Sequence, residues 1–131
     1  MVHSQRLFFI LLATATASVA AGMYDKPWAI VESADASSVR KEFPAAITRI
    51  DGQSTRNSRE SDPIEPGKHT VTVRFSTARV TQSPAEEVRE VPLDLAPCTR
   101  YRIAAQRTEG TQWKPQVYSE PIGECKRKFK Q

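Results

Sequence analysis

Hydrophobic and polar residues alternate along much of the chain, which is the pattern of a half-buried β-strand. The clearest example is residues 70–75, in which Val71, Val73 and Phe75 share one face while the residues between them are polar. Similar short runs bounded by turn residues predict further strands. They lie at residues 28–31, 46–50, 91–95, 101–106 and 113–119. We therefore expect six or seven short strands and no amphipathic helix of useful length.

Turn-forming and strongly polar residues separate these runs. Asp51-Gly52 and Glu109-Gly110 are typical of tight hairpin turns. Residues 53–65 are the most polar part of the chain and predict an exposed, mobile loop. Residues 38–43 have the composition of a single helical turn, and residues 84–90 that of an acidic, exposed loop.

The two cysteines flank the last predicted hairpin, in which Tyr101 faces Val117. Cys98 lies just before its first strand and Cys125 just after its second. An even cysteine count in an oxidising compartment predicts a disulfide, which here closes a loop of about 28 residues and contributes about 3.5 kcal/mol. The predicted fold is all-β, a small antiparallel β-sandwich of six to seven short strands with one disulfide. Pro92 confines its own strand to a sheet edge or an irregular region.

The first 21 residues predict a secretory signal peptide. Arg6 is followed by an apolar run and then by small residues up to Ala21, with cleavage expected near Ala20 or Ala21. The apolar run is too short for a retained membrane span, which needs about 20 residues. Residues 22–131 are then expected to form a single β-rich domain with a basic C-terminal tail from about residue 126. The expected location is the periplasm or the outside of the cell.

Charge narrows the choice of partners. The formal net charge is +4, and it falls to +3 when Arg6 leaves with the signal (18 basic minus 15 acidic residues). This mild excess does not indicate a nucleic-acid-binding protein, which masses basic residues on one element. The one basic cluster is the tail: Lys126, Arg127, Lys128 and Lys130. It is either a solvated end or a site of weak, salt-sensitive attraction to anionic polymers or lipid head groups, so that membrane contact is at most peripheral.

The residues that enzymes use are sparse. The expected mature chain has a single histidine, His69, which would have to serve as the general base of any nucleophilic site. Glu86, Glu87 and Glu90 crowd one charged stretch, which a solvated face explains better than a glycosidase pair. A metal site lacks ligands, and a redox pair lacks the Cys-x-x-Cys spacing. We expect no enzyme, no cofactor and no metal.

Large aromatic residues are the best candidates for binding. Trp113 and Tyr118 could stack on a sugar ring or anchor a protein partner if they are exposed. Trp113 is the better candidate for exposure, because Gln112 and Lys114 flank it near a predicted hairpin tip. The alternative, a tryptophan in the core of the sheet, stays open at this point.

Part of the chain resembles a known family. Ile50-Asp51-Gly52, then a polar loop, then Pro66-Gly67-Lys68-His69-Thr70-Val71-Thr72-Val73, resembles the PEGA-type and related transthyretin-like surface domains. The resemblance covers residues 47–73 and implies a small exported domain for adhesion, scaffolding or envelope contact. It also implies that the histidine is an element of the sheet and that there is no active site. The longer polar insert and the cysteine pair depart from the family pattern.

These observations favour a non-enzymatic exported interaction or structural module of the bacterial cell envelope. Its expected partner is an envelope protein or polysaccharide, bound through loops and an edge strand, and not a nucleic acid. One alternative is a carbohydrate-binding domain, which needs Trp113 and Tyr118 exposed and coplanar. Another is a secreted enzyme inhibitor that inserts the loop at residues 53–65.

Overall fold

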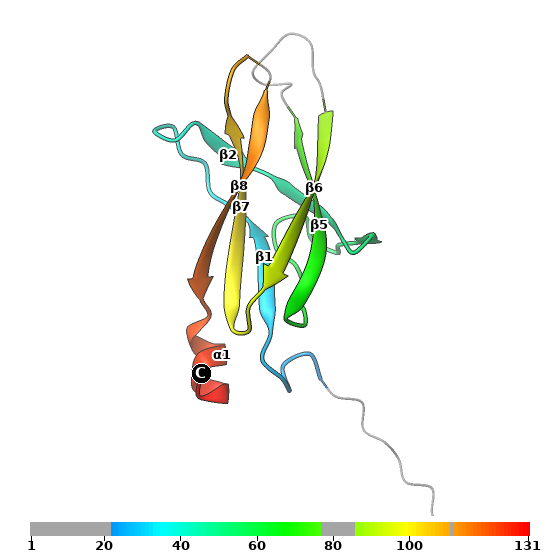
Figure 1. Cartoon of the computed structure of the whole chain (residues 1–131), viewed down its shortest axis with the longest axis vertical. Coiled ribbons are helices and arrows are strands. Elements are labelled where there is room, and N and C mark those ends of the chain that lie inside the picture. Colours follow the sequence, from blue (N-terminus) through cyan, green and yellow to red (C-terminus); the bar gives the residue numbers. More distant parts are fainter. Residues whose placement is uncertain (1–21, 77–85, 111) are drawn as a thin grey trace, which may run out of the picture.

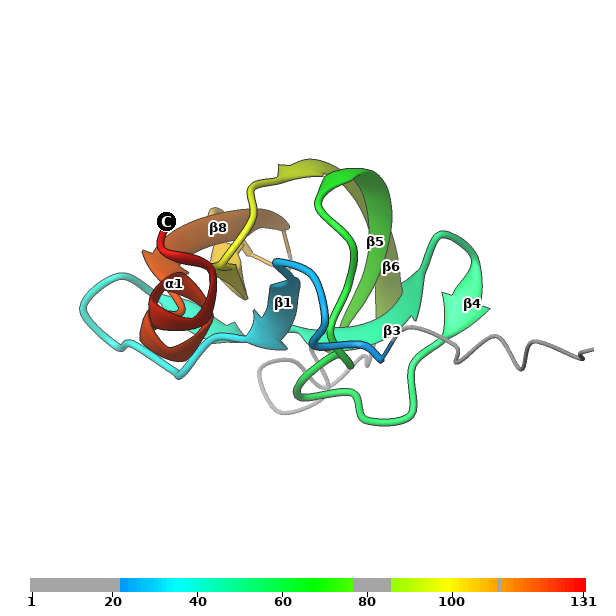
Figure 2. The ribbon, with the colours of Figure 1, turned by 90° about the horizontal axis from the view of Figure 1, so that it is seen from below.

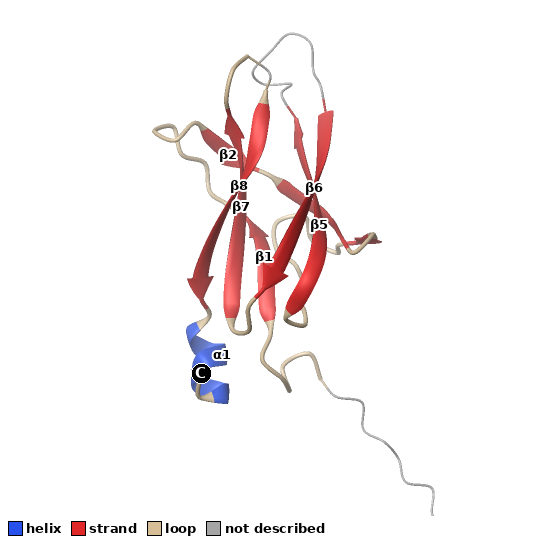
Figure 3. Cartoon of the chain, in the orientation of Figure 1, coloured by secondary structure: helices blue, strands red, loops and turns tan. Residues whose placement is uncertain are grey.

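The computed structural model describes residues 22–76, 86–110 and 112–131, so the predicted signal peptide lies outside the described residues. In the described part, the chain forms eight strands, which make up two sheets, and one short helix (Figures 1 and 3). The prediction of an all-β fold with one disulfide is confirmed. The elements are β1 (Ala29–Ser33), β2 (Glu42–Pro44), β3 (Ala46–Ile50), β4 (Gln53–Ser54), β5 (Gly67–Ser76), β6 (Glu86–Leu95), β7 (Thr99–Arg107), β8 (Trp113–Pro121) and α1 (Gly123–Phe129).

The first sheet is built around β7. Strand β8 pairs antiparallel along one edge of β7, while β1 and β2 share the other edge. β1 lies parallel to the first half of β7, and β2 lies antiparallel to the second half. The parallel β1–β7 pair departs from the expected antiparallel arrangement. It arises because both strands begin at the same end of the sandwich, where the Cys98 N–H donates to the Trp28 carbonyl (2.7 Å).

The predicted β7–β8 hairpin is present in a different register. Tyr101 lies opposite Ser119 and not Val117. The register differs because β7 continues to Arg107, which lies opposite Trp113 at the start of β8.

The second sheet has the strand order β4-β3-β5-β6. The Asp51-Gly52 turn that joins β3 to β4 has positive φ at both residues (50° and 80°), the conformation that the sequence predicted for a tight hairpin. β5 and β6 form a ten-residue antiparallel ladder, with β6 and its Pro92 at the edge, as expected. The prediction of a loop at residues 84–90 is wrong from Glu86 onward, because pairing with the half-buried β5 extends this charged segment into a strand; residues 84 and 85 lie outside the described residues.

The chain passes between the sheets at Ala45, which is fully buried between β2 and β3. The prediction of a helical turn at residues 38–43 is wrong: residues 38–41 form a turn closed by backbone bonds between Ser37 and Glu42, and β2 then pairs with β7. In Figure 2, seen from the α1 end, β1 and β8 lie on one side and β5, β6 and β4 on the other. Between the sheets lie the fully or almost fully buried side chains of Val31, Ile47, Val71, Val73, Leu95 and Ile103.

Residues 53–65 are mostly exposed, as predicted, yet they are not a free loop. Residues 59–64 lie along the outer edge of β1, where the Ser61 N–H donates to the Val31 carbonyl (2.8 Å) and the Ile64 N–H to the Ala29 carbonyl (2.9 Å). The Ser61 hydroxyl in turn accepts the Val31 N–H (3.0 Å). The reason is that backbone groups at a strand edge need partners when they are withdrawn from water.

Candidate functional site

The disulfide braces one end of the sandwich. Cys98 precedes β7, and Cys125 lies in α1, which follows β8 directly; the two sulfurs are bonded and the Cα atoms are 5.2 Å apart. The predicted disulfide is therefore confirmed. It holds α1 against the start of β7, at the open end of the β7–β8 hairpin.

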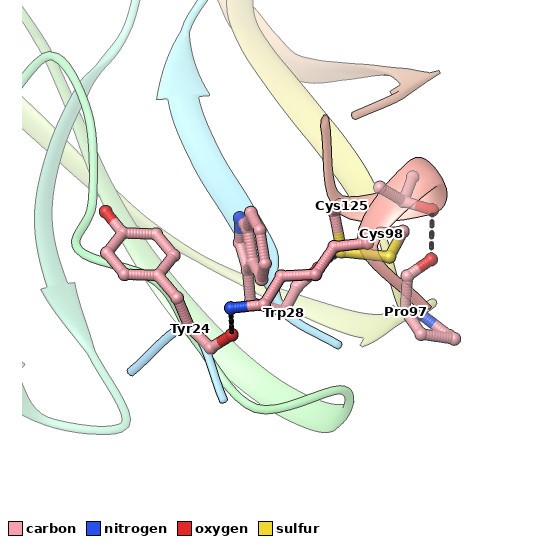
Figure 4. The surroundings of a disulfide bond; sticks show 7 residues. Tyr24, Trp28, Pro97, Cys98 and Cys125 are labelled. Carbon is pink, nitrogen blue, oxygen red and sulfur yellow. Dashed lines mark hydrogen bonds between the residues drawn. A yellow bond between two sulfur atoms is a disulfide. The ribbon is translucent and has the colours of Figure 1, made fainter. Parts of the chain in front are cut away.

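A second, smaller hydrophobic cluster surrounds the bridge. The indole of Trp28 is 4% exposed and packs between the rings of Tyr24 (4.9 Å between centroids) and Phe129 (6.0 Å), both edge-on. In Figure 4, Trp28 lies beside the bridge between Cys98 and Cys125, with Tyr24 on its other side. Ile30 and Ile122 complete the cluster. It joins the segment before β1 to α1, so that these two parts of the chain form one packed end.

The basic tail is folded and largely exposed, which fits both alternatives, a solvated end and a site of weak attraction to anions. Residues 123–129 form α1, with Glu124 in its first turn and Lys126, Arg127 and Lys128 in its last, the arrangement that the helix dipole favours. Cys125 and Phe129 are one turn apart and face the protein. Lys130 ends the helix in a left-handed conformation (φ 50°), and its N–H donates to the Lys126 carbonyl. The helix therefore turns its cations outward.

Among the residues that the structure describes, these cations have no carboxylate partner. Some arginines elsewhere are paired with carboxylates: Arg56 with Asp62 (2.8 Å), and Arg102 with Glu32 (2.5 Å) and Glu120 (2.8 Å). Within the described ranges, by contrast, no carboxylate oxygen lies within 4.0 Å of the side-chain nitrogens of Lys126, Arg127, Lys128 or Lys130. We call this surface, α1 with Lys130, the basic end. Its four cations outnumber its one acidic side chain, Glu124, so it carries a net positive charge that attracts anions.

Trp113 does not lie on the surface, so the alternative of a tryptophan in the core holds, and the binding role that required its exposure does not. It is 4% exposed and contacts the ring of Phe75 (5.5 Å between centroids), with the Arg89 guanidinium over its face (4.9 Å). Its polar neighbours in the sequence do not indicate this burial, because the strands that cover it, β5 and β6, come from a distant part of the chain. The indole Nε1 has no hydrogen-bond partner among the residues that the structure describes.

Tyr118 is exposed, as the binding hypothesis requires, but it lies five residues from Trp113 on the same strand and so faces the other side of the sheet. The two rings cannot form a coplanar platform for a sugar. The Tyr118 hydroxyl donates to the carboxylate of Glu42, a buried side chain that also accepts a bond from Arg40 Nε (3.2 Å).

The bond to Glu42, with burial second, raises the pKa of Tyr118 above its usual 10.0. Glu42 is a buried acid that the sequence analysis missed, since nothing around residue 42 marks it as special. It borders a small hollow of about 170 Å³ that also contains Arg40, Arg102 and Tyr118. The Glu42 carboxylate accepts hydrogen bonds from Arg40 and Tyr118.

His69 joins two turns. Its Nδ1 lies 2.6 Å from Asp51 Oδ2 and its Nε2 lies 2.7 Å from the Glu65 carbonyl oxygen. Burial lowers the pKa of His69, but the bonds to Asp51 and Glu65 outweigh it and raise the pKa above 6.5. Hydrogen bonds to the Asp51 carboxylate lower its pKa; the bond from the Thr70 N–H has the larger effect and the bond from His69 the smaller. Both ring nitrogens face acceptors, so the protonated ring donates two bonds and holds the Asp51-Gly52 turn to the start of β5.

In the part of the chain that is described, no group of three or more His, Cys, Asp and Glu side chains is placed to hold a metal ion. No helix there has the length and hydrophobicity to span a bilayer. Comparisons with protein-family models, with curated proteins and with solved structures find no match for this chain.

Proposed function

We propose that this protein is a non-enzymatic, exported interaction module of the bacterial cell envelope, periplasmic or secreted, which binds an anionic component of the envelope through its basic end. The observation that carries this proposal is the set of four cations of the basic end, three on α1 and Lys130 after it, that have no carboxylate within 4.0 Å among the described residues. A disulfide and a tryptophan cluster hold this helix in place. A rigid surface loses little entropy on binding.

The remaining polar groups support binding over catalysis. His69 has both ring nitrogens bonded, and Glu42 is engaged by Arg40 and Tyr118. A disulfide is typical of oxidising compartments, which supports export. The resemblance to PEGA-type and transthyretin-like surface domains fits the same role.

The test is co-sedimentation of the expected mature chain, residues 22–131, with washed bacterial envelope fragments. Binding should weaken steadily as salt rises, because the Debye length shortens from about 10 Å at 0.1 M to about 3 Å at 1 M. A triple variant, Lys126→Gln, Arg127→Gln and Lys130→Gln, should bind at least about fivefold more weakly. These substitutions keep the side chains long and suited to a helix.

The matched control removes three charges elsewhere: Lys41→Gln, Arg49→Gln and Lys114→Gln. All three residues are exposed, and they lie away from α1. The control should bind like the unaltered protein. Equal losses in the two triple variants would reduce the proposal to an effect of net charge, and no binding at low salt would end it.

A further inference from the structure

Two exposed side chains of apolar character stand next to the basic end. Met23 and Tyr24 are 53% and 51% exposed, and they are consecutive in the turn that precedes β1. The other large hydrophobic residues this exposed in the described residues, Val39 and Val88, are isolated. A single exposed valine is ordinary, whereas adjacent apolar and aromatic side chains beside a cluster of cations form an amphipathic surface.

Contacts with α1 and with buried Trp28 hold the segment that contains Met23 and Tyr24 in place. Lys128 Nζ donates to the Tyr24 carbonyl (2.6 Å), and the Tyr24 ring packs edge-on against buried Trp28. The turn is closed by a bond from the Asp25 N–H to the Gly22 carbonyl (3.1 Å). The exposed Lys26 follows in the same turn. Figures 1 and 4 show that this segment and α1 occupy the same end of the sandwich.

We propose, on the basis of the proposed function above, that the anionic component is the surface of a phospholipid bilayer. Lipid phosphates contact the ammonium groups of four lysines, while Met23 and Tyr24 enter the head-group region. The four are Lys26, Lys126, Lys128 and Lys130. Each Lys or Arg near an anionic leaflet adds attraction, and tyrosine settles at the water–lipid boundary because it has an apolar ring and a polar tip. An acidic polysaccharide would use the cations but would leave Met23 without a role.

This contact sets the orientation of the domain. The basic end lies at one end of the long β7–β8 hairpin, and the turn that begins at residues 108–110 lies at the other. Docking through α1 therefore stands the sandwich on the membrane with that turn pointing away. A partner in the periplasm or on the surface would then meet the far end.

The experiment is sedimentation of residues 22–131 with vesicles of phosphatidylcholine, with and without about one third phosphatidylglycerol. Binding to the anionic vesicles should be at least about tenfold tighter than to the neutral ones. The variant Lys126→Gln, Lys128→Gln and Lys130→Gln should lose most of this difference. Met23→Ser with Tyr24→Ser should weaken binding about threefold or more, and this loss should persist in high salt, because burial of apolar surface is not screened.

The matched control is Val39→Ser with Val88→Ser, which removes two exposed apolar side chains at other sites and should leave vesicle binding unchanged. Circular dichroism melting of each variant confirms that it is folded. Envelope binding through the basic end without vesicle binding would overturn the lipid inference and leave the proposed function standing, with a polysaccharide or protein as the anionic component. Equal binding by the Met23 and Tyr24 variant and the unaltered protein would also overturn it.

Discussion

Reduction of the Cys98–Cys125 bridge provides the sharpest test of how this fold is stabilised. The two cysteines are 27 residues apart, so the bridge closes a loop of about 28 residues. The chain-entropy relation then assigns the bridge about 3.5 kcal/mol of the free energy of unfolding. A domain of about 110 residues has an unfolding entropy of about 0.23 kcal/mol per kelvin near its midpoint. Reduction should therefore lower Tm by about 15 °C.

Scanning calorimetry of the oxidised and reduced protein measures this shift without changing the sequence. The control is the Cys98→Ala, Cys125→Ala variant, whose Tm should not respond to the reductant. The free energies from urea unfolding of the two redox forms should differ by about the same 3.5 kcal/mol.

A shift below about 5 °C would refute the reasoning, since it would mean that the crosslink hardly restricts the unfolded chain. Loss of α1 alone, seen as fast amide exchange in residues 123–129 with an unchanged main transition, would refute it in a different way. It would show that the basic end unfolds separately from the sandwich.

Three further predictions concern groups inside the fold. The folded-state pKa of His69 is raised, so its contribution to the free energy of unfolding is full below about pH 6.5 and is lost as the pH rises through the folded-state pKa. His69→Asn should therefore make the free energy of unfolding depend less on pH, in urea unfolding measured between pH 5 and 9. In a spectrophotometric titration of the tyrosines, Tyr118→Phe should remove the step at the highest pH, and Glu42→Gln should move that step down, because the carboxylate raises the phenol pKa. Trp113→Ala should lower the free energy of unfolding by about 3–5 kcal/mol in urea, whereas a surface tryptophan would cost little.

The alternation of Val71, Val73 and Phe75, the Asp51-Gly52 turn and the single cysteine pair were enough to predict strands, a hairpin and the bridge. The alternation and the turn are signals within a few neighbouring residues, and the bridge needs only the number of cysteines. The resemblance to PEGA-type and transthyretin-like domains, the export of the chain and its partner stay predictions.

The burial of Trp113, the parallel pairing of β1 and the position of residues 59–64 along β1 were decided by the tertiary structure. Period-two alternation says which face of a strand is apolar, but not which distant strand will cover that face or occupy that edge. The helix at the basic end was likewise decided by the tertiary structure. Seven residues are too few for a stable helix in water, and α1 depends on Cys125 and Phe129 packing against Trp28, which is nearly a hundred residues earlier in the chain.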